Sequence, residues 1–307
     1  MVNVIKKYRL GPLIGLVLIF IVMSILSNQF LTFSNLRNVA LQTTVNALLG
    51  VGMTFVILTS GIDLSVGSTL ALSAVISSGL MVAHVNVFLA CIIGIVVGAA
   101  GGALNGLLVS YGRLAPFIVT LGTQQLFRGL TEVYTHGMPI FNLPNSFSNL
   151  GTGLIAGIPI PVVIAAVVFI VGWIVLKKTV IGRKIYALGG NEKVAQLAGV
   201  KVNRYLVWVY VVAGVLAAFA GLILTSRLGT AEPTAGTGYE LDAITAVVLG
   251  GTSLVGGEGS IIGTLVGALI LGVIDNGLNL LNVNSFWQDA VKGLIILVAI
   301  LLDRKKN

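Results

Sequence analysis

Long apolar segments recur along almost the whole of this 307-residue chain. A segment of about 20 apolar residues is long enough to cross the hydrocarbon core of a bilayer as a helix. Such segments lie near 10–27, 43–60, 65–84, 86–110, 116–134, 161–177, 205–224, 242–255, 261–281 and 286–302, the eighth being the shortest. The pattern predicts an all-α, polytopic membrane bundle of about ten helices, because a helix satisfies its own backbone hydrogen bonds in lipid. We expect residues 1–307 to form a single transmembrane domain, with segment 177–204 as a loop within it.

The composition supports this class of fold. Hydrophobic residues make up 56% of the chain and charged residues only 9%, whereas charged residues make up about 25% of an ordinary soluble domain. The 39 glycines suit close contact between helices, since lipid offers no hydrophobic driving force for their association. The first apolar segment is too long for the core of a signal peptide and no cleavage site follows it, so we expect an uncleaved helix.

The sequence does not indicate a catalytic or metal site. Cys91 is the only cysteine, which excludes an intrachain disulfide and a cysteine cluster. His84 and His136 are isolated, and no Ser/His/Asp set or carboxylate pair has catalytic spacing. We therefore expect a protein that is not an enzyme and that carries no metal or cofactor.

Basic residues are distributed unevenly over the predicted loops. An even number of spans places both termini on one side, and 14 of the 18 Lys and Arg residues then fall on that side together with segment 177–204. Cytoplasmic loops of membrane proteins are enriched in Lys and Arg, so both termini and this segment are predicted to be cytoplasmic. The loop near 225–242, which carries Glu232, Glu240 and Asp242, is then predicted to lie outside. The net charge of +8 thus reflects membrane orientation and does not indicate a nucleic-acid partner.

Segment 177–204 is basic and polar, unlike the rest of the chain. Asn191 is a good N-cap for a short helix over 192–198, and Gly199 is a natural stop. A capped helix in a long basic loop suits a surface that docks a partner. The alternative is a plain cytoplasmic connector.

Two polar or glycine-rich stretches, 60–65 and 250–260, interrupt the apolar pattern. Asp63 and Ser65 suit the start of the third helix, where side chains accept hydrogen bonds from free backbone N–H groups. The alternative is that Asp63 lines a translocation path, because ionisable residues at membrane depth are candidates for function. The second stretch lacks the lysine of a phosphate-binding loop, so this chain does not bind ATP by that route.

Further polar side chains fall inside or at the edges of apolar segments. Asn, Gln, Ser and Thr both donate and accept, which suits an uncharged solute rich in hydroxyls, although each residue is also a candidate for a hydrogen bond between helices. Charged residues four or three apart, Arg128 with Glu132 and Asp289 with Lys292, can pair along one helix. The candidates for the translocation path are Asn46, Asp63, Asn105, Gln124, Asn276 and Asn279, with Gln125 as a further polar residue.

Three stretches carry a family resemblance: TSGIDLSVGS at 59–68, YALGGNE at 186–192 and PTAGTGYELDAITAVVLGGTSLVGGEGS at 233–260. They closely resemble the ribose permease family, the membrane subunits of binding-protein-dependent ABC importers of monosaccharides. The resemblance implies a second permease copy, a cytoplasmic ATPase with two nucleotide-binding domains, an extracytoplasmic sugar-binding protein and a location in the bacterial cell membrane.

The resemblance also implies roles for particular residues. The helix within 177–204 would enter a groove of the ATPase and couple ATP hydrolysis to transport. The coupling residues would be Asn191, Glu192, Lys193, Val194, Ala195, Gln196, Leu197, Ala198 and Gly199. By their position, Arg37, Arg227 and Glu232 are candidates for docking the binding protein.

Two other kinds of transporter remain as alternatives. An ion-gradient-coupled secondary sugar transporter also uses broken helices and polar groups at the membrane midplane. Asp63 and Asp275 are the candidates for its proton relay. A passive sugar channel would not require a docking loop.

Overall fold

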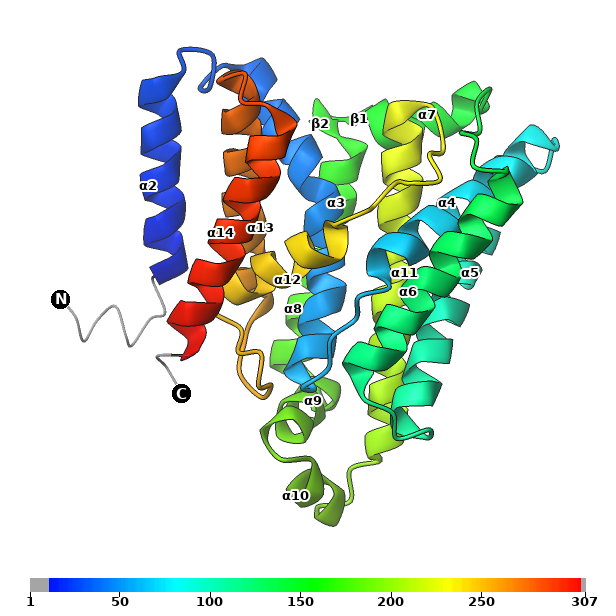
Figure 1. The fold of residues 1–307 in the computed structure, drawn as a ribbon, viewed down its shortest axis with the longest axis vertical. Helices are drawn as coiled ribbons and strands as arrows, with labels where there is room; N and C mark the ends of the chain where they lie inside the picture. Colours follow the sequence, from blue (N-terminus) through cyan, green and yellow to red (C-terminus); the bar gives the residue numbers. More distant parts are fainter. Residues whose placement is uncertain (1–10, 305–307) are drawn as a thin grey trace.

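The computed structural model describes residues 11–304, and most of these residues are helical (Figure 1). The long elements are α2 (Gly11–Leu26), α3 (Phe33–Leu58), α4 (Val66–Val82), α5 (Val87–Ser110), α6 (Pro116–Thr135), α8 (Ile160–Lys178), α11 (Val202–Leu228), α13 (Ile261–Leu280) and α14 (Ser285–Arg304). The short ones are α7 (Asn145–Thr152), α9 (Val180–Gly190), α10 (Glu192–Leu197), α12 (Tyr239–Leu249), β1 (Leu154–Ile155) and β2 (Ile158–Pro159). The basic residues within 1–10 and 305–307 lie outside the described residues.

Every predicted apolar segment contains a helix, and the all-α class is confirmed. Five of these helices are long and apolar enough to cross a membrane: Phe33–Leu58, Val87–Ser110, Ile160–Lys178, Val202–Leu228 and Ile261–Leu280. The second helix begins ten residues earlier than predicted, at Phe33, because the side chain of Thr32 accepts a hydrogen bond from the backbone N–H of Asn35 and caps it. Polar residues in its first turns lower the local hydropathy, so a search for apolar segments does not detect where this helix begins.

The prediction of a helix over 242–255 is wrong at both ends. Helix α12 begins at Tyr239 and ends at Leu249, after 11 residues. Gly251 follows with a φ of 85°, a left-handed conformation that glycine adopts without strain. A helix of this length rises only about 16 Å, roughly half of a membrane's hydrocarbon thickness.

Two of the helices start in the interior of the bundle (Figure 1). We call the end that carries α9 and α10 the α10 end, and the other the opposite end. After α3 finishes at the α10 end, residues 59–65 rise without regular structure and α4 continues from mid-height towards the opposite end. Residues 229–238 instead descend from the opposite end, and α12 lies obliquely in the middle.

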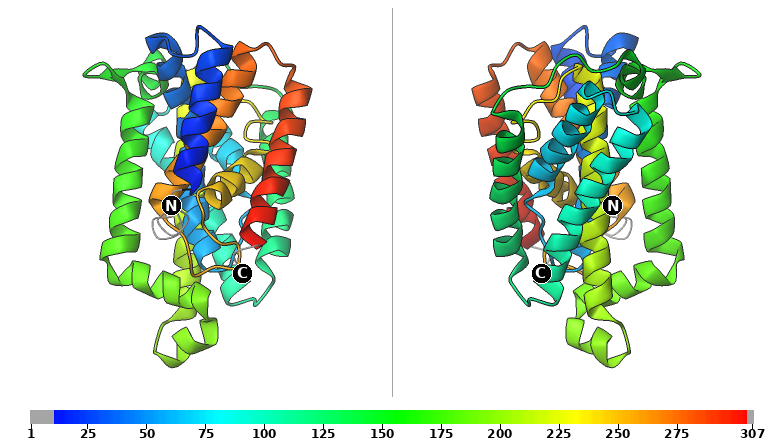
Figure 2. Two further views of the ribbon diagram at one scale, coloured as in Figure 1. Left: turned by 90° about the vertical axis from the view of Figure 1, so that its left-hand side faces the viewer. Right: turned by 90° about the vertical axis from the view of Figure 1, so that its right-hand side faces the viewer.

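The glycines allow the central helices to approach one another closely. A Cβ added at Gly102 of α5 would overlap the backbone of Tyr210 in α11, and one at Gly214 of α11 would overlap the backbone of Gly98. Small residues at such contacts are typical of helix packing in membranes. By contrast, α8 stands on a flank of the bundle and leads into α9 and α10 (Figure 2).

The connection between α6 and α8 contains structure that the sequence pattern did not predict. Helix α7 and the antiparallel pair β1–β2 lie there, at the opposite end. Ser226 of α11 fixes α7, because its Oγ accepts from the N–H of Gly151 at 2.8 Å and donates to the carbonyl of Phe147 at 2.6 Å.

Candidate coupling segment and translocation path

The predicted capped helix is present at the tip of the α10 end. The Asn191 side chain accepts a hydrogen bond of 3.0 Å from the N–H of Val194, and Gly199 has a φ of 82°. The helix ends at Leu197, one residue earlier than predicted. Leu197 is 88% exposed and Val194 is 60% exposed, so α10 presents apolar side chains outside the bundle.

Helix α9 connects α10 directly to the end of α3. A Cβ at Gly189, the second-last residue of α9, would overlap the carbonyl oxygen of Leu58, so the two backbones are in contact. The Ser60 Oγ lies 3.4 Å from the carbonyl oxygen of Gly189 and donates to it. The end of α9 therefore packs directly against the start of the first interrupted segment, residues 60–65.

The second interrupted segment, residues 250–260, also contacts the end of α3. The N–H of Gly257 donates to the carbonyl of Leu58 at 3.1 Å, and the Ser60 Oγ donates to the carbonyl of Val255 at 2.6 Å. Tyr186 of α9 donates from its hydroxyl to the carbonyl of Gly259 at 2.9 Å. We call these contacts between 58–60, 186–190 and 255–259 the glycine junction.

A polar cavity of about 780 Å³ lies beside the glycine junction. It is lined by α10, the first interrupted segment, the turn after α5 and α11, among them Ser60, Gly61, Arg113, Asn191, Lys193 and Tyr210. The cavity therefore extends from α10 to the residues that precede α4.

Asp63 lies in a buried hydrogen-bond network at the start of α4. Its carboxylate accepts from the backbone N–H of Ser65 at 2.9 Å and from the Ser65 hydroxyl at 2.6 Å. Asn105 of α5 donates to the Ser65 Oγ at 2.8 Å and accepts from Thr123 of α6 at 2.7 Å. Asp63 thus stabilises the turn before α4, but the predicted cap is not formed, because the Ser65 side chain at the N-cap position accepts no hydrogen bond from a backbone N–H of the first turn. The network ties the start of α4 to α5 and α6.

Gln124 meets a residue that the sequence placed in an outer loop. Its side-chain amide donates to Glu240 Oε1 at 2.8 Å, where Glu240 lies in the first turn of α12. Neighbouring Arg128 donates to the carbonyls of Pro233 and Ala235 and so fixes the descending segment 229–238. The sequence could not predict that Glu240 lies in the middle of the bundle, because the composition of 229–238 does not distinguish a segment that turns back into the bundle from an ordinary loop.

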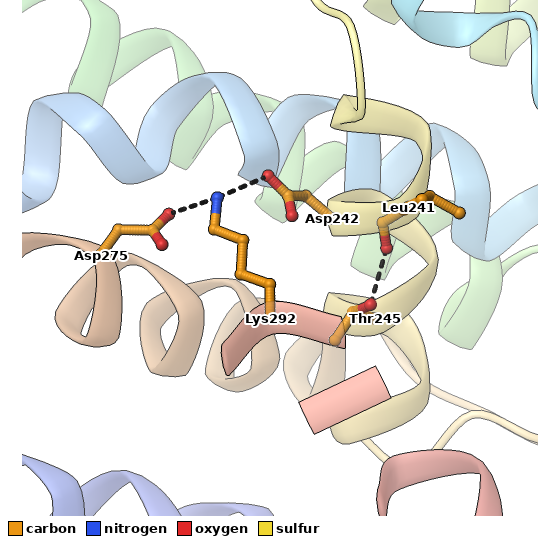
Figure 3. A network of polar contacts seen from close by, with 5 residues as sticks. All are labelled: Leu241, Asp242, Thr245, Asp275 and Lys292. Carbon is orange, nitrogen blue, oxygen red and sulfur yellow. Dashed lines mark hydrogen bonds and ion pairs between the residues drawn. The ribbon is translucent and has the colours of Figure 1, made fainter. Parts of the chain in front are cut away.

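Lys292 joins three helices (Figure 3). Its Nζ lies 3.4 Å from Asp242 Oδ2 of α12 and 3.3 Å from Asp275 Oδ2 of α13, while Lys292 itself belongs to α14. The pairs predicted along single helices, Lys292 with Asp289 and Arg128 with Glu132, are not among the ion pairs found within residues 11–304. Lys292 pairs instead with carboxylates of two other helices, and Arg128 donates to carbonyls of segment 229–238.

The remaining path candidates do not gather at one place. Asn46 lies beside Asp242. The side chains of Asn276 and Asn35 exchange two hydrogen bonds of 2.9 Å between α13 and α3. Asn279 is exposed near the opposite end, where it accepts from Gln288 at 2.9 Å.

The three candidates for docking a binding protein differ in their surroundings. Arg37 is half-buried near the start of α3, and Glu232 is half-buried in segment 229–238. The Arg227 guanidinium donates to the carbonyl of Leu41 in α3 at 3.1 Å, so it also holds the bundle together. Within the part of the chain that the structure describes, no cluster of three His, Cys, Asp or Glu residues could hold a metal ion.

Membrane-crossing helices, two helices that start inside the bundle and an exposed helix, α10, beside a polar cavity are features of a membrane transport subunit. Residues 35–300 match the family described as branched-chain amino acid transport system / permease component, and the chain belongs to this family. It is therefore a multi-pass permease of the bacterial cell membrane, a transport subunit that works with other components and not an enzyme.

Several curated relatives are similar over nearly their full length. The ribose import permease protein RbsC of Bacillus subtilis (strain 168) is 54% identical over 301 residues, 97% of this chain and 94% of the relative. RbsC of Escherichia coli (strain K12) is 51% identical over 299 residues, 96% and 93%. The D-allose transport system permease protein AlsC of that strain is 43% identical over 282 residues, 92% and 86%. No solved structure matches the chain.

Proposed function

We propose that this chain is the membrane-spanning subunit of an ATP-driven importer of ribose or a related monosaccharide. The observation that carries the proposal is the glycine junction, through which the exposed helix α10 is connected to both interrupted segments. The permease with 54% identity is named for ribose import, and the one with 43% identity for D-allose, which supports a monosaccharide substrate.

The proposed assembly contains two copies of this chain, a cytoplasmic ATPase with two nucleotide-binding domains and an extracytoplasmic sugar-binding protein. The ATPase binds the α10 end through residues 191–199, where Val194 and Leu197 are exposed. The α10 end then faces the cytoplasm, in agreement with the basic residues of 177–204. The binding protein docks at the opposite end near Arg37, Arg227 and Glu232. No cofactor is bound by this chain, which acts as one permease domain.

Transport follows from alternating access. Closure of the ATPase on ATP moves α10, and α9 transfers that movement through the glycine junction to the end of α3 and to 255–259. The chain runs from the end of α3 into α4 and from α12 into 255–259, so the movement displaces α4 and α12 together. A packed contact of this kind has discrete arrangements and does not deform continuously, which suits a switch between two states.

Two observations weigh against an ion-coupled secondary transporter. Asp63 is bonded to Ser65 at the start of α4, whereas Asp275 is paired with Lys292 in another part of the bundle. The two relay candidates therefore belong to separate networks, and neither leads to the other through the contacts described here.

Uptake of labelled ribose into proteoliposomes tests the proposal. The vesicles contain this permease and its ATPase, with the binding protein outside and ATP inside. We expect uptake that requires ATP and the binding protein and that survives collapse of ion gradients. Uptake without ATP that follows a proton or sodium gradient would overturn the proposal.

A further inference from the structure

Glu240 lies where the N-termini of α4 and α12, the two helices that start inside the bundle, meet. It belongs to the first turn of α12, and its Oε2 atom lies next to Gly67 in the first turn of α4. The residue is only 7% exposed. Gln124 holds its other oxygen, Oε1, through the hydrogen bond of 2.8 Å from α6.

The N-termini of two helices offset part of the cost of burying the Glu240 carboxylate, and one of its acceptor atoms is free. Each helix N-terminus carries a partial positive charge, so two of them stabilise one carboxylate. Glu240 Oε2 is fully buried and has no hydrogen-bond partner among the described residues. A buried acceptor without a donor is costly, which is a reason to expect a ligand that donates to it.

We propose that Glu240, positioned by Gln124, accepts hydrogen bonds from the hydroxyl groups of an uncharged monosaccharide as it passes between α4 and α12. This proposal rests on the proposed function and adds a sugar-contacting residue to it. Hydrogen bonds to an ionised carboxylate are roughly twice as strong as those between neutral groups. Free helix N-termini would otherwise attract anions such as sugar phosphates, and the Glu240 carboxylate repels them.

The passage beside Glu240 is closed in this conformation. The backbones of Gly67 and Gly236 touch, because a Cβ on Gly67 would overlap the carbonyl of Gly236. A sugar therefore reaches Glu240 only after α4 and α12 separate, which is the movement that the glycine junction would drive. Glu240 would therefore contact the sugar only while the sugar is being transported.

Comparison of deoxy sugars tests this role in the complete transporter. Glu240→Gln keeps the shape but removes the charge, and we expect ribose uptake to fall about tenfold, the effect of losing a charged hydrogen bond. The ratio of wild-type to variant uptake is then measured for ribose and for 2-, 3- and 5-deoxyribose. The binding protein's own preference cancels in each ratio. A clearly smaller ratio for the sugar that lacks the contacted hydroxyl supports the proposal.

Two kinds of result would overturn it. Equal ratios for all four sugars would show that Glu240 only packs α12 against α4, and unchanged ribose uptake in the variant would show that it is not needed. If the wild type itself shows no ATP-dependent uptake, the proposed function fails first. Glu240→Asp keeps the charge and provides a second variant should Glu240→Gln fail to assemble.

Adjacent glutamines on α6 provide a matched control. Gln124 bonds to Glu240, whereas Gln125 is exposed. We expect Gln124→Ala to lower ribose uptake several-fold through loss of one hydrogen bond, and Gln125→Ala to leave it unchanged. ATPase stimulation by the loaded binding protein is measured for every variant to confirm assembly. Equal effects of the two changes would contradict a positioning role for Gln124.

Discussion

The backbone N–H of Gly257 donates a hydrogen bond of 3.1 Å to the carbonyl oxygen of Leu58, which joins the two interrupted segments at the α10 end. Gly189 of α9 packs against the same carbonyl, at a distance that leaves no room for a side chain. Three segments far apart in the sequence thus share one backbone contact, and one of them leads through Asn191 into α10. We expect substitutions at this contact to weaken the coupling of ATP hydrolysis to transport without affecting the other steps of transport.

Two neighbouring glycines in α9 give the sharpest test of the glycine junction. A Cβ at Gly189 would overlap Leu58, whereas a Cβ at Gly190 would have nothing within 4 Å. Both changes to Ala favour helix formation by about 1 kcal/mol, so their difference isolates the contact. We expect Gly189→Ala to lower ribose uptake per ATP hydrolysed at least several-fold and Gly190→Ala to behave as the wild type. Similar coupling ratios in the two variants would show that the contact does not transmit movement.

The cap of α10 provides a second prediction. Asn191→Ala removes the hydrogen bond to Val194 and costs about 1 kcal/mol of helix stability. A helix of six residues has few other internal bonds, so we expect weaker co-purification of the ATPase and lower uptake. Asn191→Asp restores the acceptor and should restore both. If Asn191→Ala binds the ATPase and transports normally, α10 is not the coupling helix.

Local features of the sequence were enough to predict much of this structure. Apolar length located the helices, and the order of Asn191, a helix and Gly199 predicted α10 correctly, because capping depends on residues a few positions apart. The interruption at 60–65 was also evident, since polar and glycine residues break an apolar pattern.

Contacts between distant segments could not be predicted in the same way. Lys292 was expected to pair with Asp289 along one helix, yet its partners Asp242 and Asp275 come from two other helices. Glu240 was placed outside the membrane because a segment that turns back halfway has the same composition as an ordinary loop. Both errors concern contacts between segments that are far apart in the sequence, and the local pattern of residues does not reveal such contacts.

The structural interpretation of Asp63 makes a prediction that a proton relay does not. Asn at this position can still accept a hydrogen bond from the backbone N–H of Ser65 through its side-chain oxygen. We expect Asp63→Asn to retain ATP-driven uptake within about twofold. Asp63→Ala leaves the donors of Ser65 without their acceptor and should lower stability by about 1–3 kcal/mol, seen as a lower melting temperature in detergent. Loss of uptake in Asp63→Asn despite normal assembly would favour a role for the ionised side chain.

Lys292 holds α14 against α12 and α13, so its replacement should loosen all three helices. Lys292→Met leaves the carboxylates of Asp242 and Asp275 without their cation. Removing one partner of a fully buried pair typically costs about 3–5 kcal/mol, and we expect a smaller loss of stability here because Lys292 and Asp275 are partly exposed. We expect a marked fall in melting temperature. The triple variant with Asp242→Asn and Asp275→Asn removes the unpaired charges and should recover most of the loss, because the penalty arises from uncompensated charge. If the single and triple variants are equally unstable, packing of the lysine stem, and not its charge, holds α14 in place.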